Sequence, residues 1–108
     1  MELDDNNADH CLLAWRGATL LVFTGEGCSA CRWARQALPS MALPVARIAW
    51  IDAGRNGGLV ERYEVFRLPA LFLAVDGFFH GEVRSALRRD ELVKAIEQVR
   101  ERVPDELP

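Results

Sequence analysis

Residues 18–38 read ATLLVFTGEGCSACRWARQAL, and this stretch decides the expected fold. Its first part, residues 18–24, is a continuous apolar run with β-branched and aromatic members, which is typical of a strand buried on both faces. From Ala30 onward the apolar residues recur at helical spacing. The stretch therefore predicts a central strand that passes through a glycine-containing turn into a helix over 29–38. That helix should end before Pro39, which lacks a backbone donor.

Two cysteines stand at the predicted junction between the strand and the helix. Cys28 is expected at the helix N-terminus and Cys31 within the first turn, a spacing that lets the two sulfurs meet. Free N–H groups and the helix dipole at that end stabilise negative charge, which favours the Cys28 thiolate. In thiol–disulfide exchange such a thiolate attacks a disulfide, and a nearby second thiol resolves the mixed disulfide. We therefore expect Cys28 to be the nucleophile and Cys31 the resolving thiol.

The rest of the chain alternates between helical and strand patterns before it ends in a hairpin and a helix. Residues 1–7 are polar and acidic without periodicity, so we expect a disordered acidic leader followed by one domain over 8–108. The Asp76-Gly77 pair predicts a tight hairpin turn. The further expected elements are a helix over 10–15, strands over 45–51, 70–75 and 78–83, and helices over 59–63 and 90–103. This order, αβαβαββα, predicts an α/β fold with a four-stranded mixed sheet flanked by helices.

With this order of elements, the chain resembles the thioredoxin-like family over roughly residues 8–103. The residues that carry the resemblance are the strand leading into Cys-x-x-Cys, Trp50-Ile51-Asp52 followed by Tyr63-Glu64-Val65, and Leu68-Pro69-Ala70-Leu71-Phe72 before Asp76-Gly77. The resemblance implies a thioredoxin-like fold with a cis bond between Leu68 and Pro69. It also implies a substrate groove in which Leu68, Pro69 and Gly27 lie beside the cysteine pair.

Several positions depart from the pattern of thioredoxins proper. Gly27 stands where those proteins have a tryptophan, Ser29-Ala30 stands in place of Gly-Pro, and Val22 replaces a buried aspartate that helps move protons to the resolving thiol. Ser85 replaces a glycine after the hairpin, and the usual first strand is not visible. Proton transfer would then depend on water or on Glu26. The sequence therefore indicates a small, divergent relative of the family.

Composition and charge argue against several classes of binding partner and several cellular locations for this protein. The 108 residues are 50% hydrophobic and 27% charged, with a net charge of −3, so no basic footprint for nucleic acid or for an anionic membrane is present. No apolar run is long enough to span a bilayer. The acidic start lacks the basic and apolar pattern of a secretory signal, so we expect a cytoplasmic protein. Three cysteines are too few for a disulfide-stapled secreted scaffold.

Plainer interpretations of the same residues stay open. Cys28 and Cys31 could form half of a zinc site or an idle motif, but His10, Cys11 and His80 do not supply two further ligands at ligand spacing. We therefore expect no metal and no other cofactor. Cys11 fits a small apolar residue in a helix, Trp33 fits core packing, and His80 fits a structural or exposed role.

These observations favour a thiol–disulfide oxidoreductase that takes part in cell redox homeostasis. Its expected partners are a disulfide-containing protein or a small thiol substrate, together with a reductase or thiol donor. The alternative is a thioredoxin-like module that binds partners or responds to redox state without turnover. Val22 and Gly27 favour this alternative, because a buried acid and an active-site tryptophan are missing.

Overall fold

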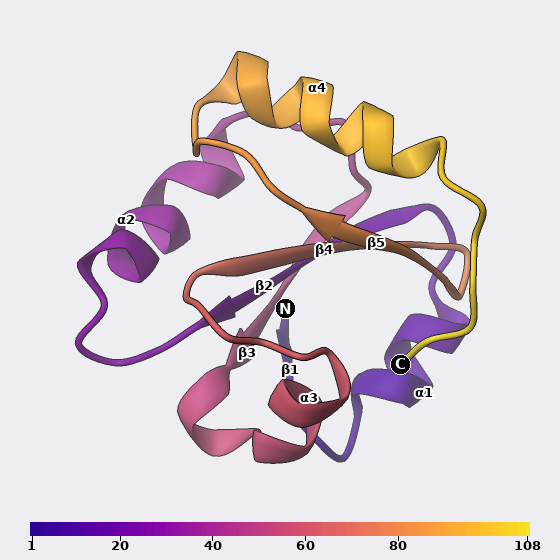
Figure 1. Ribbon diagram of the computed structural model, residues 1–108, viewed down its shortest axis with the longest axis horizontal. Coiled ribbons are helices and arrows are strands. Elements are labelled where there is room, and N and C mark those ends of the chain that lie inside the picture. Colours follow the sequence, from indigo (N-terminus) through magenta and orange to yellow (C-terminus); the bar gives the residue numbers. More distant parts are fainter.

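A computed structural model describes residues 1–108 and shows a mixed sheet between two layers of helices (Figure 1). The sheet has five strands in the order β1-β3-β2-β4-β5. The strands are β1 (Glu2–Leu3), β2 (Ala18–Thr24), β3 (Arg47–Asp52), β4 (Ala70–Val75) and β5 (Phe78–Val83). The first three run parallel to one another, whereas β4 and β5 are antiparallel to their neighbours. The strand that leads to the cysteines is therefore central, as predicted.

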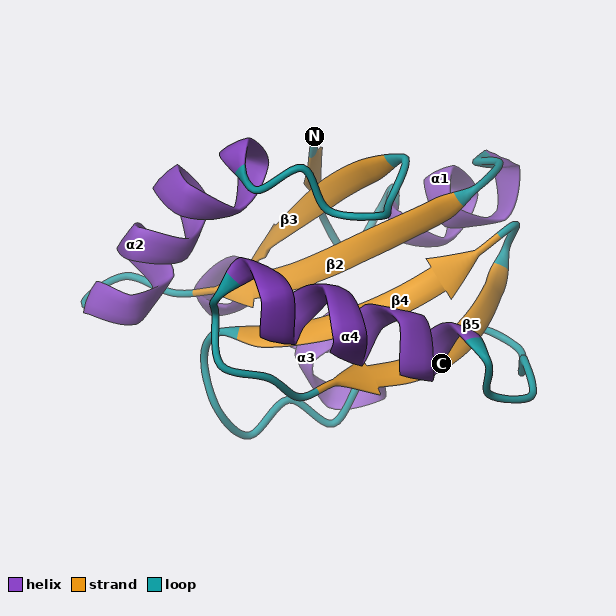
Figure 2. Ribbon diagram, turned by 90° about the horizontal axis from the view of Figure 1, so that it is seen from above, coloured by secondary structure: helices purple, strands orange, loops and turns teal.

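The helices cover both faces of this sheet, two on each. They are α1 (Ala8–Ala14), α2 (Ser29–Ala37), α3 (Gly57–Arg62) and α4 (Arg89–Arg100), with short 3₁₀ turns η1 (Leu38–Ser40) and η2 (Ala53–Arg55). Side chains of α2 and α4 belong to one core cluster, and those of α1 and α3 belong to the other. Figure 2 shows α4 in front of the sheet and α3 behind it. None of these helices has the length and apolar character needed to cross a lipid bilayer.

Strand β2 divides its side chains between the two cores. All seven of its residues are buried. Leu20 and Val22 face α2 and α4, whereas Leu21 and Phe23 face α1 and α3, because successive side chains in a strand point to opposite faces. The continuous apolar run therefore reflects a strand with no face toward solvent.

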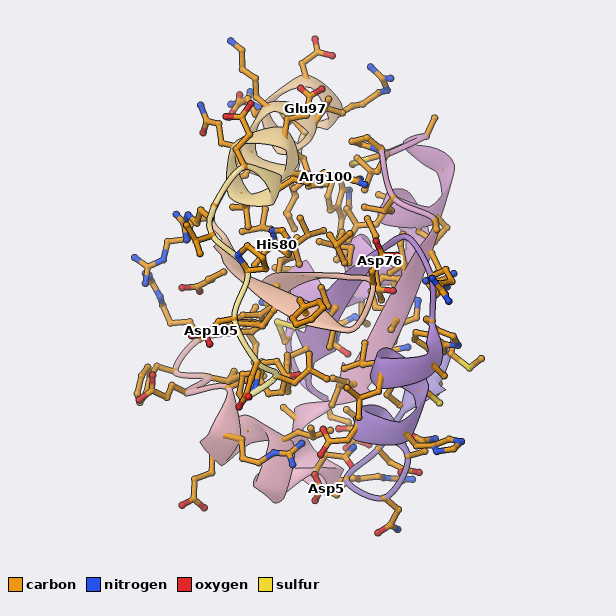
Figure 3. All side chains as sticks on the ribbon, turned by 90° about the vertical axis from the view of Figure 1, so that its right-hand side faces the viewer. Asp5, Asp76, His80, Glu97, Arg100 and Asp105 are labelled. Carbon is orange, nitrogen blue, oxygen red and sulfur yellow. A yellow bond between two sulfur atoms is a disulfide. The ribbon has the colours of Figure 1, made fainter.

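The hairpin forms at the predicted turn. Asp76 and Gly77 have φ of 52° and 85°, the positive values that a two-residue hairpin turn of this type requires. The Asp76 carboxylate accepts a hydrogen bond from the Gly17 N–H at 2.7 Å, so the turn is tied to the start of β2. After α4 the chain returns along the hairpin (Figure 3). There, Asp105 and Phe79 exchange two backbone hydrogen bonds. Helix α4 ends at Arg100, earlier than the predicted boundary at 103.

The N-terminal residues contradict the prediction of a disordered leader. Glu2 and Leu3 form β1, which pairs with Trp50 and Ile51 of β3, and Leu3 is buried in a core cluster. The sheet therefore has five strands and not the predicted four. A two-residue strand is too short to show a period in the sequence, and a single apolar side chain in an acidic stretch gives little signal.

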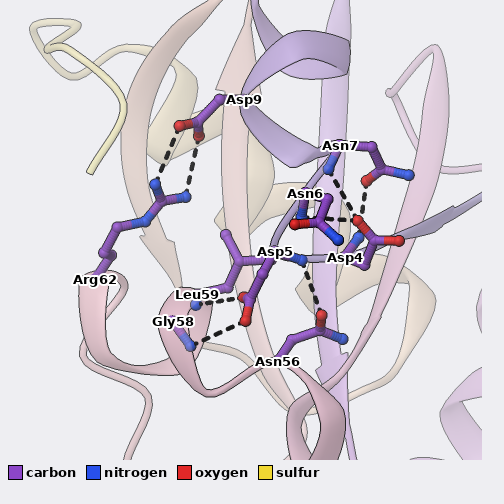
Figure 4. A network of polar contacts seen from close by, with 9 residues as sticks. All are labelled: Asp4, Asp5, Asn6, Asn7, Asp9, Asn56, Gly58, Leu59 and Arg62. Atoms are coloured by element: carbon purple, nitrogen blue, oxygen red, sulfur yellow. Dashed lines mark hydrogen bonds and ion pairs between the residues drawn. The ribbon is translucent and has the colours of Figure 1, made fainter.

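The acidic residues after β1 hold helix α3 in place (Figure 4). The Asp5 carboxylate accepts hydrogen bonds from the N–H groups of Gly58 and Leu59 at 3.2 and 2.9 Å. The Asp5 N–H donates to the side-chain oxygen of Asn56 at 2.8 Å. Asn56, the residue before α3, makes no side-chain cap of its own, so a residue distant in sequence supplies the cap. Such caps stabilise a helix by about 1 kcal/mol.

Candidate active site

The two cysteines lie where the central strand meets α2. Cys28 is the N-cap residue of α2, and Cys31 is in the first turn, as predicted. The pair is joined by a disulfide with Cα atoms 5.2 Å apart. The Cys28 sulfur accepts the backbone N–H of Cys31 at 3.2 Å. A negative charge that forms on Cys28 would therefore meet an N–H donor and the positive end of the helix.

The two cysteines of the pair differ in their exposure to solvent. Cys28 is partly exposed, whereas Cys31 is only 2% exposed and packs with its helix against the sheet. An incoming disulfide can reach Cys28 from solvent but cannot reach Cys31 without movement of the chain. This asymmetry matches the expected roles of an attacking and a resolving thiol.

The loop before β4 brings the backbone of Leu68 close to Cys28. The Leu68 carbonyl oxygen lies 3.9 Å from the Cys28 sulfur. The peptide bond between Leu68 and Pro69 is cis, the isomer that the resemblance implied. Leu68 is 38% exposed. Neither its N–H nor its carbonyl forms a hydrogen bond with another main-chain group. Its backbone is therefore available to an extended chain that approaches Cys28.

Two glycines in the loop before the cysteines leave room around the pair. A Cβ atom placed on Gly27 would meet nothing within 4 Å, and its φ of 73° is one that L-residues rarely adopt. A Cβ atom on Gly25 would lie only 2.7 Å from Cδ1 of Leu68. Gly25 therefore makes room for the Leu68 side chain, while Gly27 leaves the surface beside Cys28 open.

Two large apolar side chains are exposed on the segments that carry the site, the loop before β4 and helix α2. Phe66 is 90% exposed, two residues before Leu68 in the same loop. Trp33 is 48% exposed, which contradicts the prediction that it packs in the core. The reason is the helical phase of α2: Cys31 and Ala34 face the sheet, and Trp33 falls on the flank of the helix. A partner that covers these side chains would bury apolar surface.

The strand beneath the pair carries no ionisable side chain. Val22 is fully buried and pairs with Trp50 of β3 in a core cluster. Glu26, the alternative proton acceptor considered from the sequence, is exposed in the loop before Cys28. Cys31 lines a polar cavity of about 460 Å³, and four charged residues line the same cavity: Glu26, Arg32, Arg35 and Asp52. Arg35 follows Cys31 by four residues in α2, a spacing that puts both side chains on one side of the helix.

Tyr63 is the one ionisable side chain whose pKa is clearly displaced. Burial, reinforced by the Asp9 carboxylate and opposed by the Arg62 guanidinium, raises the pKa of Tyr63 to about 12. Its ring packs against Phe23 and Phe72, with centroids 5.6 and 5.4 Å away. The phenol therefore stays neutral over the pH range in which thiols titrate, and it does not serve as a base for the cysteines.

The other residues considered as metal ligands lie apart from the pair. No group of three or more His, Cys, Asp or Glu side chains is placed to hold a metal ion. Cys11 is a free, partly buried cysteine that packs against the core shared by α1 and α3. His80 is partly buried on β5, with a buried Nδ1 that has no hydrogen-bond partner.

A central parallel pair of strands, an antiparallel hairpin, and a Cys-x-x-Cys pair at a helix start beside a cis-proline define the class: this chain has the thioredoxin-like fold. Among solved structures it is similar to the zinc-bound form of human ERp44, with a TM-score of 0.75 and 19% sequence identity. The match covers 91% of this chain but 31% of that one, so the chain spans about a third of the length of its structural neighbour. No family model and no curated protein matches the sequence.

Proposed function

We propose that this chain is a thiol–disulfide oxidoreductase that exchanges disulfides with proteins or small molecules through Cys28 and Cys31. The observation that carries the proposal is the position of Cys28. Cys28 is partly exposed at the start of α2. Its sulfur is bonded to that of Cys31 and lies 3.9 Å from the backbone of Leu68. A structural disulfide would have no need of a neighbouring loop with free backbone groups.

The reaction takes place in two exchanges, here written for reduction of a substrate. The Cys28 thiolate attacks one sulfur of the substrate disulfide, forms a mixed disulfide and releases the other sulfur as a thiolate. The Cys31 thiolate then attacks the Cys28 sulfur, which breaks the mixed disulfide and releases the second substrate thiolate. The enzyme is left with the Cys28–Cys31 disulfide. A thiol donor or reductase returns two electrons to the pair for the next cycle.

The surroundings of Cys28 suggest how a substrate binds. Leu68 and Pro69 would lie along an extended segment that contains the substrate cysteine, with main-chain hydrogen bonds to Leu68. Gly27 leaves space on the other side for a bulky neighbour of that cysteine. The exposed rings of Phe66 and Trp33 favour substrates with apolar residues close to the disulfide.

Turnover of a protein disulfide tests the proposal. With dithiothreitol as electron donor and insulin as substrate, catalytic amounts of the protein should accelerate reduction in proportion to its concentration. Replacement of Cys28 with serine should remove this acceleration. Cys11→Ala should retain it, because Cys11 packs on the face of the sheet opposite α2. Binding of insulin without acceleration would refute the proposal and favour a module that binds partners without turnover.

A further inference from the structure

Charged side chains line the cavity next to Cys31, and the two exchange steps described above assign them no role. Its lining residues are Thr24, Gly25, Glu26, Gly27, Cys31, Arg32, Arg35 and Asp52. Cys31 must lose its proton before it can attack Cys28, and burial disfavours the charged form of a thiol. A group that stabilises negative charge on Cys31 would therefore speed resolution of the mixed disulfide.

Arg35 is a cation held in place at this cavity. It follows Cys31 by four residues in α2, a spacing that places the two side chains on one face of the helix. The Arg35 Nε donates to the Thr24 hydroxyl at 3.1 Å, and its guanidinium lies 5.0 Å from the centre of the Trp50 ring. It also forms an ion pair with Glu2 of β1. These contacts come from three strands, so Arg35 has little freedom to leave the cavity.

The other charged groups around Cys31 are less constrained or already engaged. Arg32 and Glu26 are exposed, so solvent screens their effect on the cysteine. The Asp52 carboxylate accepts the N–H of Gly54 at 3.0 Å and lies 3.7 Å from Nε of Arg55. The strand beneath contributes Val22, which carries no charge. Arg35 is therefore the positive charge best placed to stabilise a thiolate on Cys31. Glu2, which pairs with Arg35, is the negative charge best placed to weaken that stabilisation.

We propose that Arg35 stabilises the thiolate of Cys31 and that Glu2, through its ion pair with Arg35, moderates this effect. The N-terminal strand would thereby set the reactivity of the resolving cysteine. In the step concerned, the Cys31 thiol gives its proton to water in the cavity, and its thiolate bonds to the Cys28 sulfur as the substrate leaves. This role rests on the proposed function, because only exchange chemistry requires Cys31 to ionise.

The test follows the ionisation of Cys31 itself and does not depend on turnover. In a Cys11→Ala/Cys28→Ser background, Cys31 is the sole cysteine, and its thiolate can be titrated by ultraviolet absorbance. Adding Arg35→Gln should raise the pKa of the Cys31 thiol and lower its thiolate fraction at a fixed pH by about three- to tenfold. Glu2→Gln should change the same pKa in the opposite direction. Arg35→Lys should keep most of the effect of arginine.

An exposed arginine in the last turn of α4 provides the control. Arg100→Gln removes one positive charge far from the cavity lining and should leave the titration unchanged. The proposal fails if Arg35→Gln leaves the titration of Cys31 unchanged, or if Glu2→Gln and Arg35→Gln move it in the same direction. If Arg35→Gln does not fold, the proposal is judged by Glu2→Gln, whose side chain is 61% exposed. A shifted titration in a chain without turnover would refute the oxidoreductase proposal; it would support the effect of Arg35 and Glu2 on the ionisation of Cys31 but remove its role in disulfide exchange.

Discussion

Replacing Cys31 with serine should convert a transient mixed disulfide into a stable one. Cys28 would keep its exposed position at the start of α2, and attack on a substrate disulfide would continue. A serine hydroxyl does not ionise near neutral pH, so nothing would displace the bound substrate from Cys28. Nearly every protein molecule should then carry a covalent partner after exposure to excess disulfide, until an external thiol is added.

Mass spectrometry of the intact adduct and of its peptides measures this outcome. The expected adduct joins the substrate to Cys28, and the Cys28→Ser variant should form none. Wild-type protein treated in the same way should return to its own disulfide without an accumulated adduct. An adduct through Cys11, or no adduct with Cys31→Ser, would contradict the assigned roles of the two cysteines.

Phe23→Ala should destabilise the fold by about 3–5 kcal/mol, a large share of the roughly 5–15 kcal/mol that holds a domain of this size folded. Phe23 is fully buried in the last part of β2, and its ring lies 5.6 Å from those of Tyr63 and Phe72. Loss of the ring leaves a cavity that the surrounding strands and helices cannot close. Urea unfolding should show a lower midpoint with an unchanged slope.

Phe66→Ala is the matched control for this core substitution. Phe66 is 90% exposed, so its truncation should change stability by less than about 0.5 kcal/mol. Equal losses of stability in the two variants would show that the core is not packed as described. If Phe66→Ala also weakens substrate turnover, that result would support a binding role for the exposed ring.

The fold follows from patterns that are strong over many residues. The unbroken apolar run 18–24 predicts a central strand, and in the structure that strand has neighbours on both edges and helices on both faces. The positive φ of Asp76 and Gly77 confirms the hairpin expected from that dipeptide. Each of these features depends on residues that are neighbours in the sequence, so it can be predicted from the sequence alone.

What the sequence hides depends on contacts between distant residues. Leu3 is buried only because β3 lies next to it, and Asp5 caps α3 from more than fifty positions away. Trp33 has a large apolar side chain of the kind found in cores, but its position on the flank of α2 leaves it 48% exposed. Arg35 contacts Glu2, Thr24 and Trp50, which three different strands bring together around it. No period or motif in a single sequence carries such information.

If Cys28 is the reactive thiol of an exchange pair, the three cysteines should differ in their rates of alkylation. The reduced protein is treated with iodoacetamide at neutral pH, and each cysteine is followed by mass spectrometry. Cys28 should react about tenfold or more faster than Cys31 and Cys11, because it alone combines exposure with the positive end of α2. Equal rates for the three cysteines, or a faster reaction at Cys31, would contradict this role of Cys28.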